Sequence, residues 1–257
     1  MDIKRASPRP ELRSVVRSFE ERRADLGSGM LSWPVAARPH QILNIHLAEP
    51  YRVRLDNGTL NTSPEISVVG PQTYRRAHVH LPGQVHVFNI LFQPTGLNRL
   101  IGINMTSLVN EDPAASDVLG DSATTLGDAV RAALDFQQRV AAVERWVGTM
   151  LDKSRPDGAI GAASRRMIAV RGGARIEALV AKSGLSTSQF QRRFTTQVGM
   201  TPKLFARTIR LDRADHAPQR AAPAVDRHHP RTRLLRSGPF HPRMPRVRRL
   251  AAGPPRR

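Results

Sequence analysis

The hydrophobic pattern of the chain has a period of two between Gln41 and Phe92. Apolar residues alternate with polar ones around Leu43, Ile45 and Leu47, and again in the stretch YRVRLDNG, whose Asn-Gly pair is typical of tight hairpin turns. The stretch RAHVHLPGQVHVFNILF predicts two more strands, one on each side of a Pro-Gly pair. Several short strands at this spacing indicate a small barrel or sandwich.

The period changes to three and four beyond this region. The stretch FQPTGLNRLIG predicts the end of a strand followed by a short helix, and the apolar positions from Leu126 to Met150 predict one or two amphipathic helices. The GSG stretch at 27–29 predicts a turn. The stretch DKSRPDG at 152–158 combines charges with Pro and Gly, so it predicts a domain boundary at residue 152.

Two helices are predicted directly after this boundary. The first buries Ile160, Ala163 and Met167 and ends at RGG, residues 171–173. The second begins near Ile176 and ends at KSGL, residues 182–185, because the glycine there can adopt the left-handed conformation that terminates a helix.

Two further helices are predicted from their caps. Ser186 and Gln189 have the spacing of a capping box, which predicts a third helix with one apolar face. Thr201 and Pro202 predict the start of a fourth, with Thr as the N-cap and Pro at the first helical position. The predicted buried positions of these two helices are Phe190, Phe194, Val198, Leu204, Phe205, Ile209 and Leu211.

Charge is distributed unevenly over the 257 residues, whose net charge is +19. Residues 1–152 hold sixteen side chains of each sign, whereas 153–214 hold thirteen basic and three acidic ones. The excess positive charge therefore lies in the helical segment and beyond it, where a polyanion would be met. The chain has no cysteine, which excludes disulfides, thiolate metal sites and cysteine nucleophiles. It shows no apolar run of membrane-spanning length and no signal peptide, so we expect a cytoplasmic protein without a membrane partner.

Two short helices joined by a tight glycine turn are the pattern of a helix-turn-helix, whose second helix enters the DNA major groove. With Phe190 and Phe194 buried, the third predicted helix would present its polar and basic side chains outward. Gln can pair with adenine and Arg with guanine, while Ser and Thr suit a base or a phosphate. The alternative is that these side chains only solvate a surface helix. The outward residues are Thr187, Ser188, Gln191, Arg192 and Thr195.

Residues 176–214 resemble the first helix-turn-helix and the linker helix of the AraC/XylS family of transcription regulators. The matching elements are Ile176, Leu179, Val180, Ala181, Gly184-Leu185-Ser186, Phe190, Arg193, Phe194, Gly199, Thr201-Pro202, Phe205, Arg210-Leu211 and Ala214. The resemblance implies double-stranded DNA as a partner and makes Ser188, Gln191 and Arg192 the base readers, with Arg193 at a phosphate or in packing. The N-terminal region, with RPELRSVVRSFEE, is similar to the sensor domain of one branch of this family, which resembles a cupin-like barrel.

The fold class predicted is therefore α+β. Residues 1–152 would form a small cupin-like β-barrel with flanking helices, a sensor for a small-molecule effector or a homodimerisation domain. Residues 153–214 would form the all-α DNA-binding segment, and 215–257 a disordered basic tail. The complete set of predicted DNA-binding residues is Ser186, Thr187, Ser188, Gln191, Arg192, Arg193 and Thr195.

The chain departs from the family after Ala214, where a second helix-turn-helix should follow. Residues 215–257 instead hold eleven Arg, no Lys, eight Pro and four His, and this density of proline prevents a packed helical subdomain. A shift of reading frame in a GC-rich gene would produce this composition. Back-translation of LLRSGPFHPRM, residues 234–244, read one base later, is compatible with Tyr-Tyr-Asp-Gln-Ala-His-Phe-Ile-Arg-Glu-Cys. That string resembles the second recognition helix of the family. A genuine basic tail is the alternative.

Other chemistry is weakly indicated. His78 and His80, with His86 nearby, have the spacing of a metal site on a strand, but polar positions on the solvated face of that strand are the favoured interpretation. No catalytic trio, phosphate loop or glycine fingerprint appears, so we expect neither an enzyme nor a cofactor or metal. Two functions stay open: a DNA-binding transcription regulator, impaired by its tail, or a ligand-binding or dimerising barrel with an incomplete, non-specific DNA-binding half.

Overall fold

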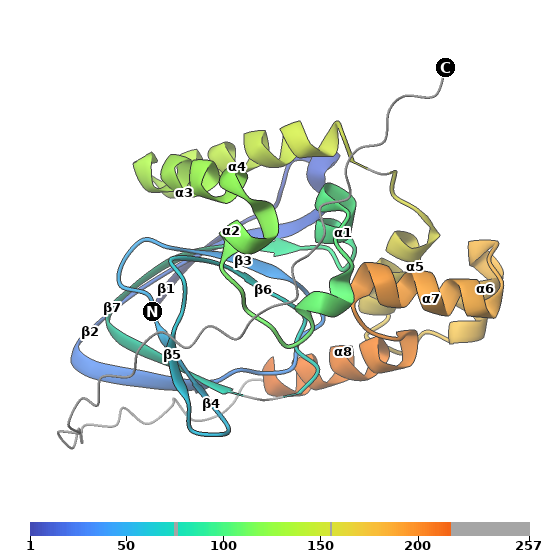
Figure 1. The fold of residues 1–257 in the computed structure, drawn as a ribbon, viewed down its shortest axis with the longest axis horizontal. Coiled ribbons are helices and arrows are strands. Elements are labelled where there is room, and N and C mark those ends of the chain that lie inside the picture. Colours follow the sequence, from blue (N-terminus) through green and yellow to red (C-terminus); the bar gives the residue numbers. More distant parts are fainter. Residues whose placement is uncertain (75–76, 155, 217–257) are drawn as a thin grey trace. The chain divides into compact units, whose positions relative to one another are not determined.

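The computed structural model describes residues 1–74, 77–154 and 156–216. In this part of the chain, a curled antiparallel half-barrel sheet is followed by eight α-helices (Figure 1). The strands are β1 (Asp2–Ala6), β2 (Val16–Pro34), β3 (Ile42–His46), β4 (Arg52–Leu55), β5 (Leu60–Thr62), β6 (Ile66–Val69) and β7 (Ala77–Phe92). The helices are α1 (Gly96–Ile101), α2 (Ala115–Leu119), α3 (Asp121–Ala132), α4 (Phe136–Leu151), α5 (Ala159–Ala169), α6 (Ile176–Ser183), α7 (Thr187–Val198) and α8 (Pro202–His216), with 3-10 turns η1 (Pro10–Leu12) and η2 (Met105–Leu108).

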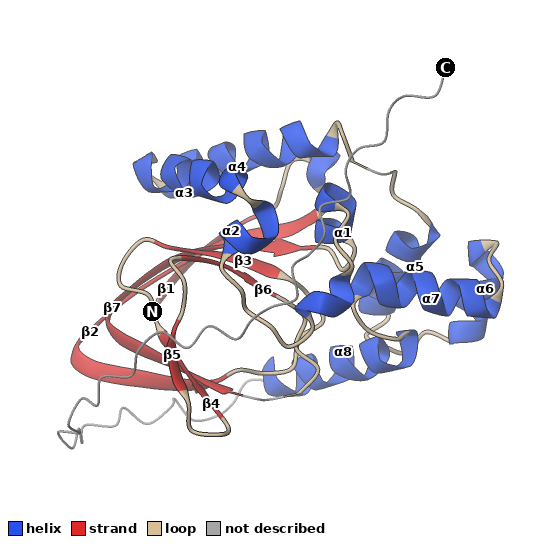
Figure 2. Cartoon of the chain, viewed as in Figure 1, coloured by secondary structure: helices blue, strands red, loops and turns tan. Residues whose placement is uncertain are grey.

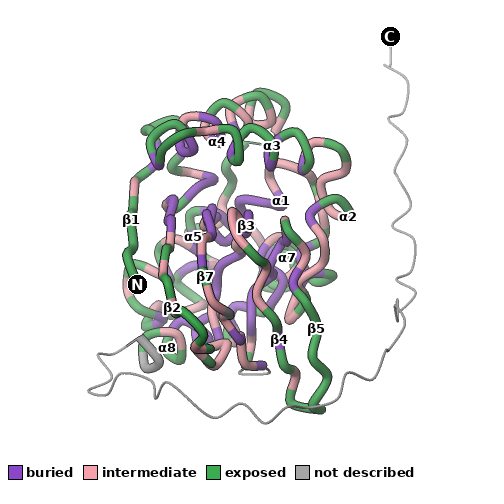
Figure 3. Tube along the Cα trace, turned by 90° about the vertical axis from the view of Figure 1, so that its left-hand side faces the viewer, coloured by how far each residue is buried: buried purple, intermediate pink, exposed green. Residues whose placement is uncertain are grey.

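The sheet is organised around two long strands, β2 and β7, which pair antiparallel along most of their length. Its main path runs β1-β2-β7-β3-β6, while β4 pairs with the first half of β7 and with β5 (Figure 2). The path begins at β1 and ends at β6, so in the described residues the sheet curls without closing into the barrel that we expected. The outer strands β1 and β5 are exposed (Figure 3).

Two sequence-based expectations about the strands are wrong. The stretch RAHVHLPGQVHVFNILF forms the single strand β7 instead of two strands, because both of its halves pair with β2. The GSG stretch lies within β2, where the pairing register with β7 shifts between Asp25 and Met30. The extra residues bulge out of the ladder at this place, so the strand continues where the sequence indicated a turn.

Two hydrophobic clusters hold the described chain together. One face of the sheet packs against α1 to α4 through residues such as Phe19, Phe88 and Val143. The second cluster lies within α5 to α8 and includes Met167 and Phe194. The predicted starts of α5 to α8 and the predicted ends of α5 to α7 agree with the structure, whereas α8 continues to His216, two residues into the segment expected to be a disordered tail. Leu211, expected in the core, is 38% exposed. The C-terminal end of α7 packs against η2, which follows α1 in the chain.

Candidate nucleic-acid interface

Helices α6 and α7 are joined by a tight turn whose geometry is set locally. Gly184 ends α6 in the left-handed region, with a φ of 68°. The Ser183 hydroxyl donates to the carbonyl of Val180 at 2.6 Å and accepts from the Leu185 amide at 3.2 Å. These contacts satisfy backbone groups that the end of a helix would otherwise leave without a partner.

The N-terminus of α7 carries the capping box that the sequence predicts. The Gln189 amide donates to the Ser186 hydroxyl at 3.3 Å, and the Ser186 amide donates to the Gln189 side chain at 3.2 Å. Reciprocal caps of this kind fix where a helix begins and hence which residues share each of its faces.

Phenylalanines anchor α7 to its neighbours. Phe190, Phe194 and Val198 are fully buried, and the Phe194 ring centroid lies 5.7 Å from that of Phe190 and 5.5 Å from that of Phe205 on α8. Because this apolar face is fixed, the opposite face of α7 points to solvent. The side chains of Ser186, Thr187, Ser188, Gln191, Arg192 and Arg193 are exposed.

The structure distinguishes two of the predicted DNA-binding residues from the others. Thr195 is half-buried, and its hydroxyl donates to the carbonyl of Gln191 at 2.9 Å, inside the same helix. Ser186 is exposed, but its hydroxyl caps α7. The other five side chains, Thr187, Ser188, Gln191, Arg192 and Arg193, are exposed, and in the described chain no side-chain hydrogen bond or ion pair engages them, so all five are available for an external partner.

Among the histidines of β7, His78 and His86 are half-buried and His80 is buried, so the solvated face that the sequence indicated is wrong for His80. His80 is 8% exposed, and neither of its ring nitrogens has a hydrogen-bond partner in the described residues. Burial, and next the charge of Arg54, lowers the pKa of His80. His86 contacts the Glu21 carboxylate at 3.0 Å. His80 pairs with Ser32 of β2 and with Arg52 of β4, so a neighbouring strand flanks it on each side. The described residues contain no group of three or more side chains suited to hold a metal ion.

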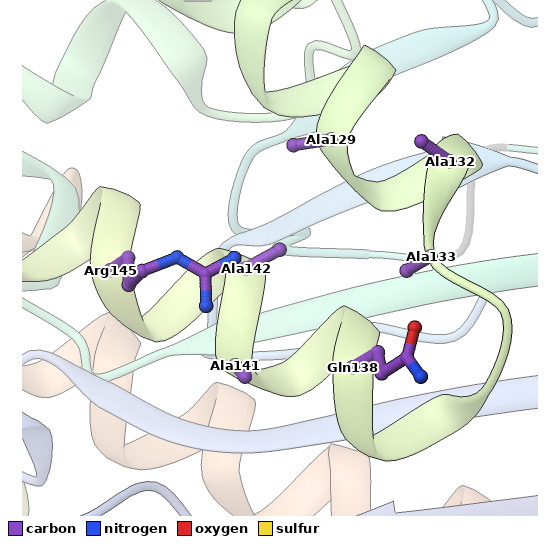
Figure 4. Close-up of a pocket in the computed structure, with 7 residues that line it drawn as sticks. All are labelled: Ala129, Ala132, Ala133, Gln138, Ala141, Ala142 and Arg145. Atoms are coloured by element: carbon purple, nitrogen blue, oxygen red, sulfur yellow. The ribbon is translucent and has the colours of Figure 1, made fainter.

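A shallow groove lies between α3 and α4, away from α7 (Figure 4). Its volume is about 360 Å³, and it is lined by Ala129, Ala132, Ala133, Gln138, Ala141, Ala142 and Arg145. None of the predicted DNA-binding residues contributes to it. Within the described part of the chain, no helix combines the length and the apolar character that crossing a membrane requires.

Comparison with known proteins gives one family match. Residues 4–113 match a family described as a domain of unknown function, DUF6597, which covers the sheet and ends before α2. No curated protein matches the chain.

Three solved structures illustrate the structural likenesses. ToxT from Vibrio cholerae O395 is 9% identical over 77% of this chain and 81% of its own, with a TM-score of 0.40. The AraC-like transcriptional activator CuxR is 14% identical over 82% of this chain and 86% of its own, with a TM-score of 0.34. A putative ethanolamine utilization protein Q from Salmonella typhimurium LT2 is 10% identical over 35% of this chain and 67% of its own, with a TM-score of 0.25. At such low identities and TM-scores, these likenesses do not establish a function for the chain.

Proposed function

We propose that this chain is a DNA-binding transcription regulator of the AraC type, which reads DNA with α7. The observation that carries the proposal is the two-faced character of this helix: Phe190 and Phe194 are fully buried, while Gln191 and Arg192 are exposed. A capped helix that follows a tight turn and presents such a face is suited to the major groove. The AraC-type resemblance of residues 176–214 supports the same function.

Each of the seven predicted DNA-binding residues has a role in this proposal. Gln191 pairs with adenine and Arg192 with guanine through two hydrogen bonds each, and Ser188 contacts a base or a phosphate. Arg193 and Thr187 contact phosphates, which position the helix without reading sequence. Ser186 and Thr195 act mainly on the helix itself, because their hydroxyls are bonded within it.

The sheet and its flanking helices form the sensor part in this proposal. They would bind a small-molecule effector and contribute to a homodimer, in a protein that works in the cytoplasm and is not an enzyme. The tail, of which residues 217–257 lie outside the described residues, replaces the second helix-turn-helix of the family, as a shift of reading frame would.

The Arg192→Ala variant tests the reading role of α7. A preferred site is first selected from random duplexes with the purified chain, and binding is then measured on that site and on a scrambled duplex. The variant should lose about 1–3 kcal/mol on the selected site and relax the preference at one base pair. Arg166, exposed on α5, provides the control: Arg166→Ala should leave the preference unchanged. An equal loss on both duplexes for Arg192→Ala would make this side chain a phosphate contact and would contradict the proposed role.

A binding module with an incomplete DNA-binding half is the second candidate. The composition of residues 215–257 favours it, since proline-rich and arginine-rich sequence cannot form a second reading helix. Under this function, selection from random duplexes would yield no preferred sequence, although the sheet would still bind its ligand. The selection experiment therefore separates the two functions before any variant is made.

A further inference from the structure

A row of polar side chains crosses four strands at one register level on the concave face of the sheet. Glu20 of β2 lies opposite Asn89 of β7, Asn89 lies opposite Asn44 of β3, and Asn44 lies opposite Ser67 of β6. All four residues are buried. The neighbouring positions on these strands, including Phe88, pack into the hydrophobic cluster on the other face. The sheet therefore buries a polar face as well as an apolar one.

Several polar atoms near this row have no hydrogen-bond partner in the described residues. They include the Ser67 hydroxyl, the Nε2 atom of His46 and the Nε atom of Arg22. Burial, and next the charge of Arg131, lowers the pKa of His46 to about 4, so this ring is neutral at pH 7. Buried polar groups are almost always hydrogen-bonded in proteins. Such a concentration of atoms without partners is typical of a site that a bound molecule completes.

Arg38 is a cation of this region that has no ion-pair partner among the described residues. It is partly buried, and its Nε atom has no hydrogen-bond partner in the described chain. Burial lowers the pKa of the Arg38 guanidinium, and the charge of Arg22 lowers it further. Tyr51, Asp212 on α8 and Asp112 act on this pKa in the opposite direction. A desolvated guanidinium is stabilised by an oxyanion that accepts two of its hydrogen bonds.

The cavity beside Arg38 combines this cation with apolar walls. Tyr51 also lines it, and its hydroxyl accepts a hydrogen bond from Asn44 at 2.7 Å. Burial raises the pKa of Tyr51, so the phenol stays neutral and does not repel an anion. Asp112 lines the cavity too and has an interaction partner of its own. The apolar walls are formed by Val35, Val53, Val69, Ala77 and Val79.

We propose that this concave site binds a small carboxylic acid with an apolar body, with the carboxylate on Arg38 and the body against the valines. The inference rests on the proposed function in that it makes the acid the effector of the sensor part. The cavity has a volume of about 20 Å³, enough for one water molecule, so an acid must widen it on binding. Widening of the cavity moves the residues around Arg38. Because the charge of Asp212 in α8 acts on Arg38, this movement changes the electrostatic interaction between the site and α8. A ligand that prefers the widened form shifts the protein toward it.

Calorimetric titration of the full chain with three acids tests the proposal. The probes are butyrate, benzoate and phenylacetate, each compared with its uncharged amide, with inorganic phosphate as an anion that lacks an apolar body. At least one acid should bind and raise the melting temperature, with its amide about tenfold weaker or more. Arg38→Gln should weaken acid binding about tenfold or more, and Arg38→Lys should keep part of it. Arg54→Gln, an exposed cation on β4, is the matched control and should leave binding unchanged.

Four results would overturn the proposal. These are no binding of any of the three acids at millimolar concentration, equal binding of acid and amide, equal binding of phosphate, and unchanged acid binding by Arg38→Gln. If Arg38→Gln does not fold, Val79→Phe decides, because filling the cavity should abolish acid binding while Arg38 remains. Acid binding that survives Val79→Phe would contradict the site. These titrations contain no DNA. A negative result in them contradicts the acid site alone, whereas a negative result of the Arg192→Ala experiment contradicts the proposed reading role of α7.

Discussion

Gly199 is a single residue at which two packed parts of the chain meet. It follows the last residue of α7 in the left-handed region, with a φ of 93°. A Cβ atom placed there would lie 2.8 Å from the carbonyl oxygen of Met105, in η2. Gly184, at the end of α6, has a similar backbone conformation with a φ of 68°, but a Cβ there would have no neighbour within 4 Å. The two glycines thus share a conformation and differ in their surroundings.

This pair yields a stability prediction. Gly184→Ala should destabilise the protein by about 1–2 kcal/mol, the usual penalty of the left-handed conformation for a residue with a Cβ. Gly199→Ala should cost measurably more, because its Cβ also meets a backbone oxygen that cannot move without displacing η2. Urea unfolding of both variants measures the difference. Equal losses would show that α7 and η2 do not pack closely in solution.

At the scale of elements, buried charges connect α4 to the sheet. The Glu21 carboxylate on β2 accepts from Arg139 of α4 at 3.0 Å and contacts His86 of β7 at 3.0 Å. Arg139 also donates to the carbonyl of Ala133 at 2.9 Å. Glu21 and Arg139 are both buried, so each depends on the other for its compensating charge.

Removing one charge of this network should therefore be costly. Glu21→Gln should lower the free energy of unfolding by about 3–5 kcal/mol, because Arg139 then remains buried without its counter-charge. Glu65→Gln is the control: Glu65 pairs with Arg131 at 2.9 Å, but its side chain is 74% exposed. Its loss should cost about 0–1 kcal/mol. Denaturant titrations of the two variants give the comparison, and a small effect at Glu21 would mean that water reaches Arg139.

At the scale of the whole molecule, the distribution of charge governs how the chain would bind DNA under the proposed function. Residues 215–257 contribute eleven arginines beyond the proposed reading helix. Arginine side chains that contact only phosphates bind DNA without regard to sequence, and each neutralised phosphate adds about 0.9 to the slope of log affinity against log salt concentration. A second reading helix would instead add several base contacts, each worth about 1–3 kcal/mol.

The chain should consequently bind DNA weakly at physiological salt, with less discrimination than two reading helices would give and with a steep salt dependence. A chain that continues in the shifted reading frame after Ala214 should bind one site selectively, because two helices then read successive major-groove faces. Titrations of both chains against the selected and scrambled duplexes, at several salt concentrations, measure this. If the chain with the arginine tail bound the selected duplex tightly and in preference to the scrambled one at high salt, α7 would be sufficient for sequence-specific binding. The tail would then not stand in place of a required second reading helix.

Helix boundaries and the exposed face of α7 could be predicted from the sequence because both depend on residues close together in the chain. The Ser186–Gln189 capping box spans four residues, and the spacing of Phe190 and Phe194 defines the buried side of one helix. Such interactions form at the same place in any fold that keeps the helix. The assignment of bases to Gln191 and Arg192 remains a prediction.

Only the tertiary structure decided which strands pair and which polar residues are buried. Glu21 and Arg139 are 118 residues apart in the sequence, and no local pattern connects them. The continuity of β7 depends on β2, and His80 is buried where β7 pairs with both β2 and β4. The alignment of Glu20, Asn89, Asn44 and Ser67 likewise requires the registers of three strand pairs. Register is set by long-range packing, and a shift of one residue would turn each side chain to the opposite face. The sequence by itself therefore determined the local elements, while the tertiary structure created the concave polar face.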